Sequence, residues 1–140
     1  MIQRTIYLEA LKTWRDKQVI KVVTGVRRCG KSTLFQQYIN LLLTNGVQQE
    51  NIIYINLEDL GFERLLDYRE LYTYIAERLS TSANTYVFLD EVQQCKNFEK
   101  AVDSLYLREN VDIYITGSNA NLLSGELATL LSGRYVLIEM

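Results

Sequence analysis

The length and composition of the chain describe one compact globular domain rather than a fibrous or disordered protein. Of its residues, 48% are hydrophobic and 23% are charged, as in ordinary globular domains. A length of 140 residues is too short for a second folded domain. The net charge of −2 gives no electrostatic basis for general nucleic-acid binding, and no apolar run approaches the roughly 18 residues of a membrane-spanning helix. Two cysteines and no histidine exclude a disulfide framework and a zinc site. The N-terminus is not a secretory signal, so we expect a cytoplasmic protein without a membrane partner.

The first element that the sequence predicts is an amphipathic helix over residues 4–17. Tyr7, Leu8, Leu11 and Trp14 recur there at helical spacing, which is typical of a face that packs on a core. A platform on which Trp14 stacks adenine is the alternative. The apolar run over residues 19–24 then predicts the first buried strand.

The nine residues after that strand, GVRRCGKST, fit the phosphate-binding pattern G-x-x-x-x-G-K-[ST], with Gly25, Gly30, Lys31 and Ser32 at its defining positions. Glycine at both ends allows backbone N–H groups to turn inward around a phosphate chain. Lys31 adds a charge for the β- and γ-phosphates, and the Ser32 hydroxyl can ligate their magnesium. The expected nucleotide-binding residues are Gly25, Val26, Arg27, Arg28, Cys29, Gly30, Lys31, Ser32 and Thr33.

Residues 32–43 have the periodicity of a helix that would point its positive N-terminal end at the bound anion. A second strand is predicted over residues 51–59, and it ends in Glu58 and Asp59. These carboxylates are either a charged strand exit or catalytic groups at the edge of the sheet where ligands bind. One or two helices are predicted over residues 61–82.

The stretch TYVFLDE, residues 85–91, is an apolar strand that ends in two adjacent carboxylates. Together with the upstream phosphate loop, it predicts that Asp90 and Ser32 hold magnesium and that Glu91 orients or deprotonates the attacking water. A solvated acidic turn is the alternative.

A crossover helix ending at Asn110 is predicted next, followed by a fourth strand over residues 111–119. The polar residues at the exit of this strand are Thr116, Ser118 and Asn119. We expect Ser118 and Asn119 to face the γ-phosphate and the water, and so to sense which nucleotide is bound. The alternative is a glycine-containing turn that Asn119 caps.

The remainder of the chain predicts a helix broken at residues 124–125 and a last strand over residues 135–140. Arg134 precedes that strand. It is predicted either to act as an arginine finger on the γ-phosphate of an adjacent subunit, which would make a homo-oligomer, or to form a local salt bridge.

The motifs GVRRCGKST, YVFLDE, IYITGSN and LSGRY together resemble the AAA+-like P-loop ATPases of bacteria and archaea that usually carry an uncharacterised C-terminal domain. This resemblance implies an α/β fold, a three-layer sandwich with a five-stranded parallel sheet in the order 5-1-4-3-2. ATP and Mg²⁺ are the cofactors it implies, with Lys31 on the phosphates, Asp90 in a Walker B motif and Glu91 on the water. ATP is preferred over GTP by this resemblance alone.

Family members are usually longer, so residues 1–140 are expected to be an ATPase core that lacks a helical lid and the C-terminal domain. The leading hypothesis is an ATPase that couples hydrolysis to conformational change in partner domains, with weak activity in the core alone. A nucleotide-dependent switch with little turnover is the alternative, and a small-molecule kinase is disfavoured because no arginine-rich lid segment is present. A local contact of Arg27 and Arg28 with nucleic acid is compatible with the sequence, but no sequence feature supports it.

Overall fold

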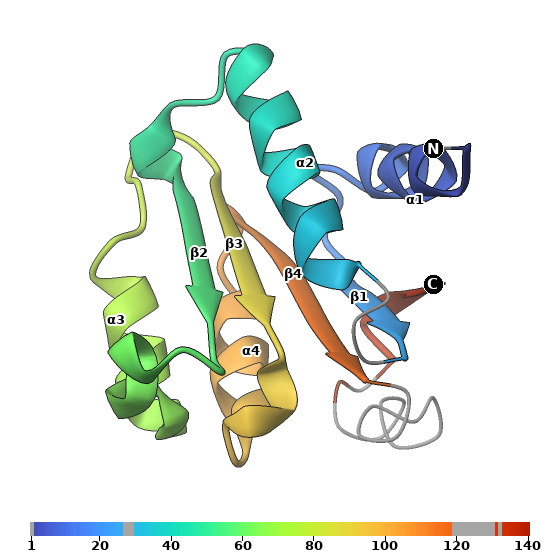
Figure 1. Ribbon diagram of the computed structural model, residues 1–140. Coiled ribbons are helices and arrows are strands. Elements are labelled where there is room, and N and C mark those ends of the chain that lie inside the picture. Colours follow the sequence, from blue (N-terminus) through green and yellow to red (C-terminus); the bar gives the residue numbers. More distant parts are fainter. Residues whose placement is uncertain (1, 27–29, 119–130, 132) are drawn as a thin grey trace.

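The computed structural model describes residues 2–26, 30–118, 131 and 133–140, and its centre is a five-stranded parallel sheet in the order β2-β3-β4-β1-β5 (Figure 1). This order is the predicted 5-1-4-3-2 read from the other edge, so the predicted fold class is confirmed. The strands are β1 (Ile20–Gly25), β2 (Ile52–Asn56), β3 (Thr85–Asp90), β4 (Val111–Ser118) and β5 (Tyr135–Glu139).

Helices connect β1 to β2, β2 to β3 and β3 to β4, as parallel pairing requires. The α-helices are α1 (Ile2–Thr13), α2 (Lys31–Thr44), α3 (Tyr68–Ala76) and α4 (Phe98–Tyr106), and the 3₁₀ segments are η1 (Gln49–Asn51), η2 (Leu60–Leu66) and η3 (Val92–Gln94). The predicted helix over residues 32–43 is confirmed. The helix predicted over residues 4–17 ends at Thr13 instead, and the break predicted at residues 124–125 lies outside the described residues.

Alternate residues of each strand enter two separate hydrophobic cores, one on each face of the sheet. Val22, Val87 and Ile115 face the core that α3 and α4 complete. Phe88 and Tyr114 belong to the other core, which lies under α1 and α2. The rings of Phe88 and Tyr114 stack there with their centroids 4.6 Å apart. Strands buried on both faces explain why they appear in the sequence as continuous apolar runs.

Polar groups lie along both ends of the parallel strands, which we call the carboxyl edge and the amino edge of the sheet. The carboxyl ends of β1, β3 and β4 bring Gly25, Asp90 and Ser118 to one edge, where Gly25 pairs in register with Ser118. The amino ends bring Lys21 and Asp112 to the other, and both side chains are buried. Because all the strands run in the same direction, the polar group at their carboxyl ends and the polar group at their amino ends lie one strand length apart.

We define the N-edge cluster as Lys21, Asp112 and Tyr114. The Lys21 ammonium forms a salt bridge with Oδ1 of Asp112 and donates to the carbonyl of Lys17 at 2.7 Å. Oδ2 of Asp112 accepts from the backbone N–H of Asp16 at 2.9 Å and from the Tyr114 hydroxyl at 2.8 Å. Each carboxylate oxygen of Asp112 thus has a donor, and the cluster ties the α1–β1 turn to the sheet.

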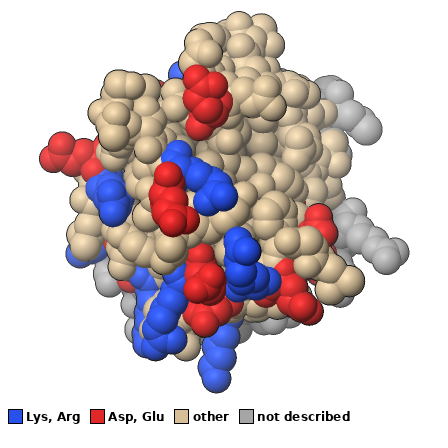
Figure 2. Space-filling model, turned by 90° about the vertical axis from the view of Figure 1, so that its left-hand side faces the viewer, with Lys and Arg blue, Asp and Glu red and all other residues tan. Residues whose placement is uncertain are grey.

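The described part of the face that includes β2 and α3 has no large patch of charges of one sign (Figure 2). Figure 2 shows Lys and Arg side chains intermingled there with Asp and Glu side chains, in keeping with the net charge of −2. Among the helices that the structure describes, none has the length and apolar character needed to cross a membrane.

Candidate nucleotide-binding site

The phosphate-loop sequence leads directly into the N-terminus of α2. Gly30 adopts the left-handed conformation, with φ 102°, which a residue with a side chain rarely adopts. The first hydrogen bond inside the helix runs from the N–H of Leu34 to the carbonyl of Gly30, at 2.9 Å. The N–H groups of Ser32 and Thr33 precede that bond and point out of the helix end, where the helix dipole favours an anion.

A pocket of about 210 Å³ opens at this helix end, and its lining residues are Gly30, Lys31, Ser32, Thr33 and Glu91. Complete small-molecule sites usually measure about 300–1,000 Å³, so this pocket matches the phosphate portion of a nucleotide better than a whole nucleotide. The structure brings together the second half of the predicted loop and the predicted catalytic carboxylate. Of the predicted residues, Arg27, Arg28, Cys29 and Asn119 lie outside the described residues.

Lys31 is only 4% exposed, although its neighbours Ser32 and Thr33 are exposed. Its ammonium donates to the carbonyls of Gly25 at 3.2 Å and Val26 at 3.1 Å. The same nitrogen lies 3.9 Å from Oε1 of Glu91. These contacts hold a positive charge at the wall of the pocket.

Asp90 is completely buried, and each of its carboxylate oxygens accepts a hydrogen bond. Oδ1 accepts from the Thr116 hydroxyl at 2.5 Å, and Oδ2 accepts from the Tyr54 hydroxyl at 2.5 Å. Each of these oxygens has a second lone pair for another donor. Neither Thr116 nor Tyr54 was among the predicted site residues.

The donors near the pocket have the chemistry that magnesium prefers. Ser32 offers a hydroxyl and Asp90 a carboxylate, both hard oxygen ligands. Within the described part of the chain, no three or more His, Cys, Asp or Glu side chains form a metal-binding group. Magnesium in nucleotide sites is held by one or two carboxylates, phosphates and waters rather than by a protein cage, so the donor set fits it.

Glu91 has a left-handed backbone, with φ 56° and ψ 54°, which is unusual for a residue with a side chain. Such a conformation costs roughly 1 kcal/mol and persists only where the surroundings enforce it. Here its N–H donates to the Thr116 hydroxyl at 2.9 Å, and Nε2 of Gln93 donates to Oε2 of Glu91 at 2.7 Å. The strained turn directs the carboxylate into the pocket instead of along the strand.

The predicted sensing position is partly within the described residues. Ser118 ends β4 beside Gly25, which places the tip of this strand next to the phosphate loop. Thr116, two residues earlier, contacts both Asp90 and the N–H of Glu91. Thr116 shares a face of β4 with the predicted Ser118, because side chains two residues apart in a strand share a face, and this was the available signal.

Arg134 lies at the opposite edge of the sheet from the pocket. Its carbonyl accepts from the N–H of Ile20 at 2.9 Å, and its guanidinium lies 5.2 Å from the centre of the Tyr106 ring. This position separates Arg134 from Lys31 of the same chain, so its role as an arginine finger on another subunit stays a prediction. The stacking role of Trp14, which follows α1, also stays a prediction.

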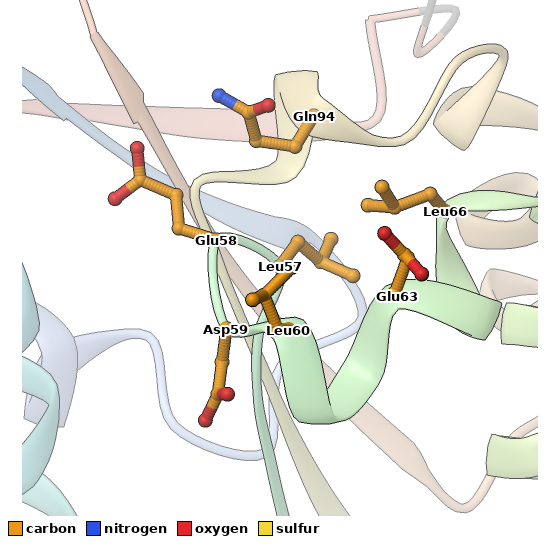
Figure 3. Close-up of a pocket in the computed structure, with 7 residues that line it drawn as sticks. All are labelled: Leu57, Glu58, Asp59, Leu60, Glu63, Leu66 and Gln94. Atoms are coloured by element: carbon orange, nitrogen blue, oxygen red, sulfur yellow. The ribbon is translucent and has the colours of Figure 1, made fainter.

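A second pocket, of about 250 Å³, lies at the exit of β2 (Figure 3). Its lining residues are Leu57, Glu58, Asp59, Leu60, Glu63, Leu66 and Gln94. Glu58 and Asp59 point away from each other in this pocket, so their carboxylates do not converge on one ligand position. Oδ1 of Asp59 accepts from the N–H of Gly61 at 2.9 Å and caps η2. These contacts favour the charged strand exit over the catalytic alternative.

Comparison with known proteins now adds a family to this geometry. A family model described as an AAA domain matches residues 17–140. The chain belongs to the AAA domain family. It is 46% identical to an uncharacterized protein of Haemophilus influenzae over 141 aligned positions and 39% identical to MJ1544, an uncharacterized protein of Methanocaldococcus jannaschii, over 123. These alignments cover 100% and 86% of the chain, but only 35% and 26% of the two relatives.

Solved structures with this AAA domain fold are more distant in sequence. AMPPCP-bound DnaA from Aquifex aeolicus superimposes on 95% of the chain, with a TM-score of 0.56, 18% identity and 43% of DnaA covered. A chain of the Drosophila ORC bound to AT-rich DNA and Cdc6 covers 99% of this chain, with a TM-score of 0.65, 11% identity and 54% of that chain covered. At these identities the likeness shows the fold, which is the AAA+-like P-loop core predicted from the motifs.

Proposed function

We propose that this AAA domain binds ATP with Mg²⁺ and hydrolyses it, and that the cycle changes the conformation of partner domains. The observation that carries the proposal is the pocket at the N-terminus of α2, where Lys31 and Glu91 meet. A helix end and a lysine supply positive charge for phosphates, and a carboxylate supplies a base for water. DnaA, which shares the fold, was solved with the ATP analogue AMPPCP.

Each residue has a separate role in the proposed reaction. The Glu91 carboxylate accepts a proton from the water whose oxygen bonds to the γ-phosphorus, while the bond from that phosphorus to the bridging β–γ oxygen breaks and ADP leaves. Lys31 and the N–H groups of Ser32 and Thr33 balance the charge on the phosphate oxygens. Ser32 and Asp90 would hold magnesium, which when bound neutralises the β- and γ-phosphate oxygens.

The experiment is calorimetry of MgATP binding to the wild type and to Lys31→Ala, with ADP release recorded in the same samples. We expect the substitution to weaken binding by about 100-fold or more, because it removes the charge from the pocket. Lys12→Ala, which changes an exposed lysine on α1, is the control and should bind like the wild type. Equal affinity in Lys31→Ala and the wild type would exclude the pocket as the nucleotide site.

A nucleotide-dependent switch is the second candidate, and one observation favours it. In the described state both oxygens of the Glu91 carboxylate face partners of the chain itself, Gln93 at 2.7 Å and Lys31 at 3.9 Å. A base held in this way is poorly placed to take a proton from water until the contacts change. We therefore propose weak turnover for this chain; rates typical of complete ATPases, about 1–100 s⁻¹, would contradict it.

Partners are part of the same proposal. Arg134 faces away from the pocket of its own chain, so a second copy is the proposed recipient of its charge, and a homo-oligomer the proposed active form. The curated relatives extend well beyond the aligned region, and we propose that the remaining part of such a protein receives the conformational change. On the face that Figure 2 shows, the intermingled charges give no support for a DNA partner.

A further inference from the structure

Tyr54, in the middle of β2, contacts the candidate metal ligand Asp90 although its strand carries none of the predicted motif residues. β2 pairs with β3, and Tyr54 is opposite Phe88, two residues before Asp90. The Tyr54 hydroxyl crosses that distance and donates to Oδ2 of Asp90 at 2.5 Å. A short bond from a hydroxyl to a buried carboxylate belongs to the strong class of hydrogen bonds.

Burial raises the pKa of the Tyr54 hydroxyl above its ordinary value, and the hydrogen bond to Asp90 raises it further. Tyr54 is therefore a donor from β2 to the carboxylate on β3.

We propose that Tyr54 is a positioning residue for magnesium, whose hydroxyl orients the Asp90 carboxylate for the ion. This inference rests on the proposed ATP-binding function. Ser32, in the first turn of α2, lines the pocket and supplies the other hard oxygen ligand of the proposed ion.

The orientation of Asp90 follows from the same arrangement. Thr116 holds one carboxylate oxygen and Tyr54 holds the other, so the plane of the carboxylate is set from two neighbouring strands. Each oxygen keeps one lone pair for a magnesium-bound water. Magnesium demands nearly ideal octahedral geometry, and ligands that are already oriented therefore lower the cost of binding it.

The test is the factor by which Mg²⁺ tightens nucleotide binding, measured by calorimetry with AMPPCP in the presence of Mg²⁺ and in the presence of EDTA. Tyr54→Phe keeps the ring in its packing position and removes the hydroxyl alone. We expect the Mg²⁺ factor to fall about tenfold in this variant, with metal-free affinity within about twofold of the wild type. A purely structural role would lower stability without changing the Mg²⁺ factor.

Tyr86→Phe is the matched control, because Tyr86 is also a strand tyrosine that donates to an aspartate, Asp16, at 2.7 Å, but at the opposite edge of the sheet. Its Mg²⁺ factor should equal that of the wild type. If Tyr54→Phe does not fold, Tyr54→Leu takes its place. An unchanged or larger Mg²⁺ factor without the hydroxyl would overturn the inference alone, whereas no AMPPCP binding by the wild type would overturn the proposed function as well.

Discussion

The two edges of the sheet carry buried polar groups of the same kinds, a carboxylate, a lysine and hydroxyl side chains, but they differ in what surrounds them. In the N-edge cluster, Lys21 and Asp112 satisfy each other inside the protein. At the carboxyl edge, Lys31 is also buried but lines a pocket of about 210 Å³ with the free end of a helix, and Asp90 directly precedes Glu91, which lines it as well. The pocket that Asp112 lines at the other edge measures only about 20 Å³. The polar atoms of the N-edge cluster are paired within the protein, whereas the pocket at the carboxyl edge leaves room for a ligand.

This difference shows that burial of charge is not by itself evidence of a site. A buried pair removes two ions from water, and the cost of this desolvation is offset only by excellent mutual geometry. The N-edge cluster reaches that balance without any ligand. At the carboxyl edge, Lys31, Ser32 and Glu91 line a pocket with room for a ligand.

The largest expected effect is on stability, from Asp112→Ala. Removal of the carboxylate leaves the Lys21 ammonium buried without its partner, and we expect the free energy of unfolding in urea to fall by about 3–5 kcal/mol. Nucleotide affinity of the folded protein should not change. The control is Glu109→Ala, an exposed acid nearby, which should stay within about 0.5 kcal/mol of the wild type. A loss of affinity without a loss of stability would reverse the roles of the two edges.

Glu91→Gln should have the next largest effect, on the reaction and not on stability. We expect single-turnover ADP formation to slow by about 100-fold, since the amide cannot accept the proton from water, while MgATP affinity stays within about twofold. Glu58→Gln, at the exit of β2, is the control for loss of one negative charge at this edge. Unchanged turnover in Glu91→Gln would favour the switch over the ATPase.

A smaller effect is expected from removal of one hydroxyl at each end of the same face of β4. Tyr114→Phe and Thr116→Val each remove a donor to a buried carboxylate, and we expect each to lower the free energy of unfolding by about 1 kcal/mol. Only Thr116→Val should also reduce the factor by which Mg²⁺ tightens AMPPCP binding. Equal Mg²⁺ factors in the two variants would show that the two edges are coupled.

The smallest effect is expected from replacement of the whole N-edge ion pair. Lys21→Met combined with Asp112→Leu fills similar volume without burying charge, and such replacements are often neutral or stabilising. We expect the free energy of unfolding to lie within about 1 kcal/mol of the wild type, by urea titration. A much lower value would mean that the pair contributes more than its own desolvation cost.

Much of the fold and half of the site could be predicted from the sequence, because glycine, lysine and apolar runs indicate a loop or a strand by their spacing within a short segment. The phosphate loop and the five strands are of this kind. The sheet order came from resemblance to a family. The contacts of Tyr54 and Thr116 with Asp90 were not predicted, because residue spacing alone does not encode which side chains of two neighbouring strands meet.

The predicted ends of helices differ from the observed ends where tertiary contacts override the periodicity of the sequence. The predicted helix over residues 4–17 ends at Thr13 because the N–H of Asp16 bonds to Asp112, and Asp16 takes a left-handed conformation with φ 61°. The one or two helices predicted over residues 61–82 are two, η2 and α3, which divide at Asp67; its carboxylate caps α3 through the N–H of Arg69 at 2.8 Å. The Asp67 cap was a readable signal. The Asp16 contact was not, since its partner is 96 residues away.

The position of β1 in the sheet has a consequence for how the chain folds. β1 carries the phosphate loop, yet its neighbours are β4 and β5, as in the pairing of Lys21 with Tyr114 and Ile20 with Tyr135. During synthesis the loop therefore emerges early and stays without its sheet until almost the whole domain has been made. Closing such distant contacts is entropically costly and slow. The geometry that receives phosphate should be among the last features to form, and a nucleotide that selects the completed fold would pull the folding equilibrium toward it.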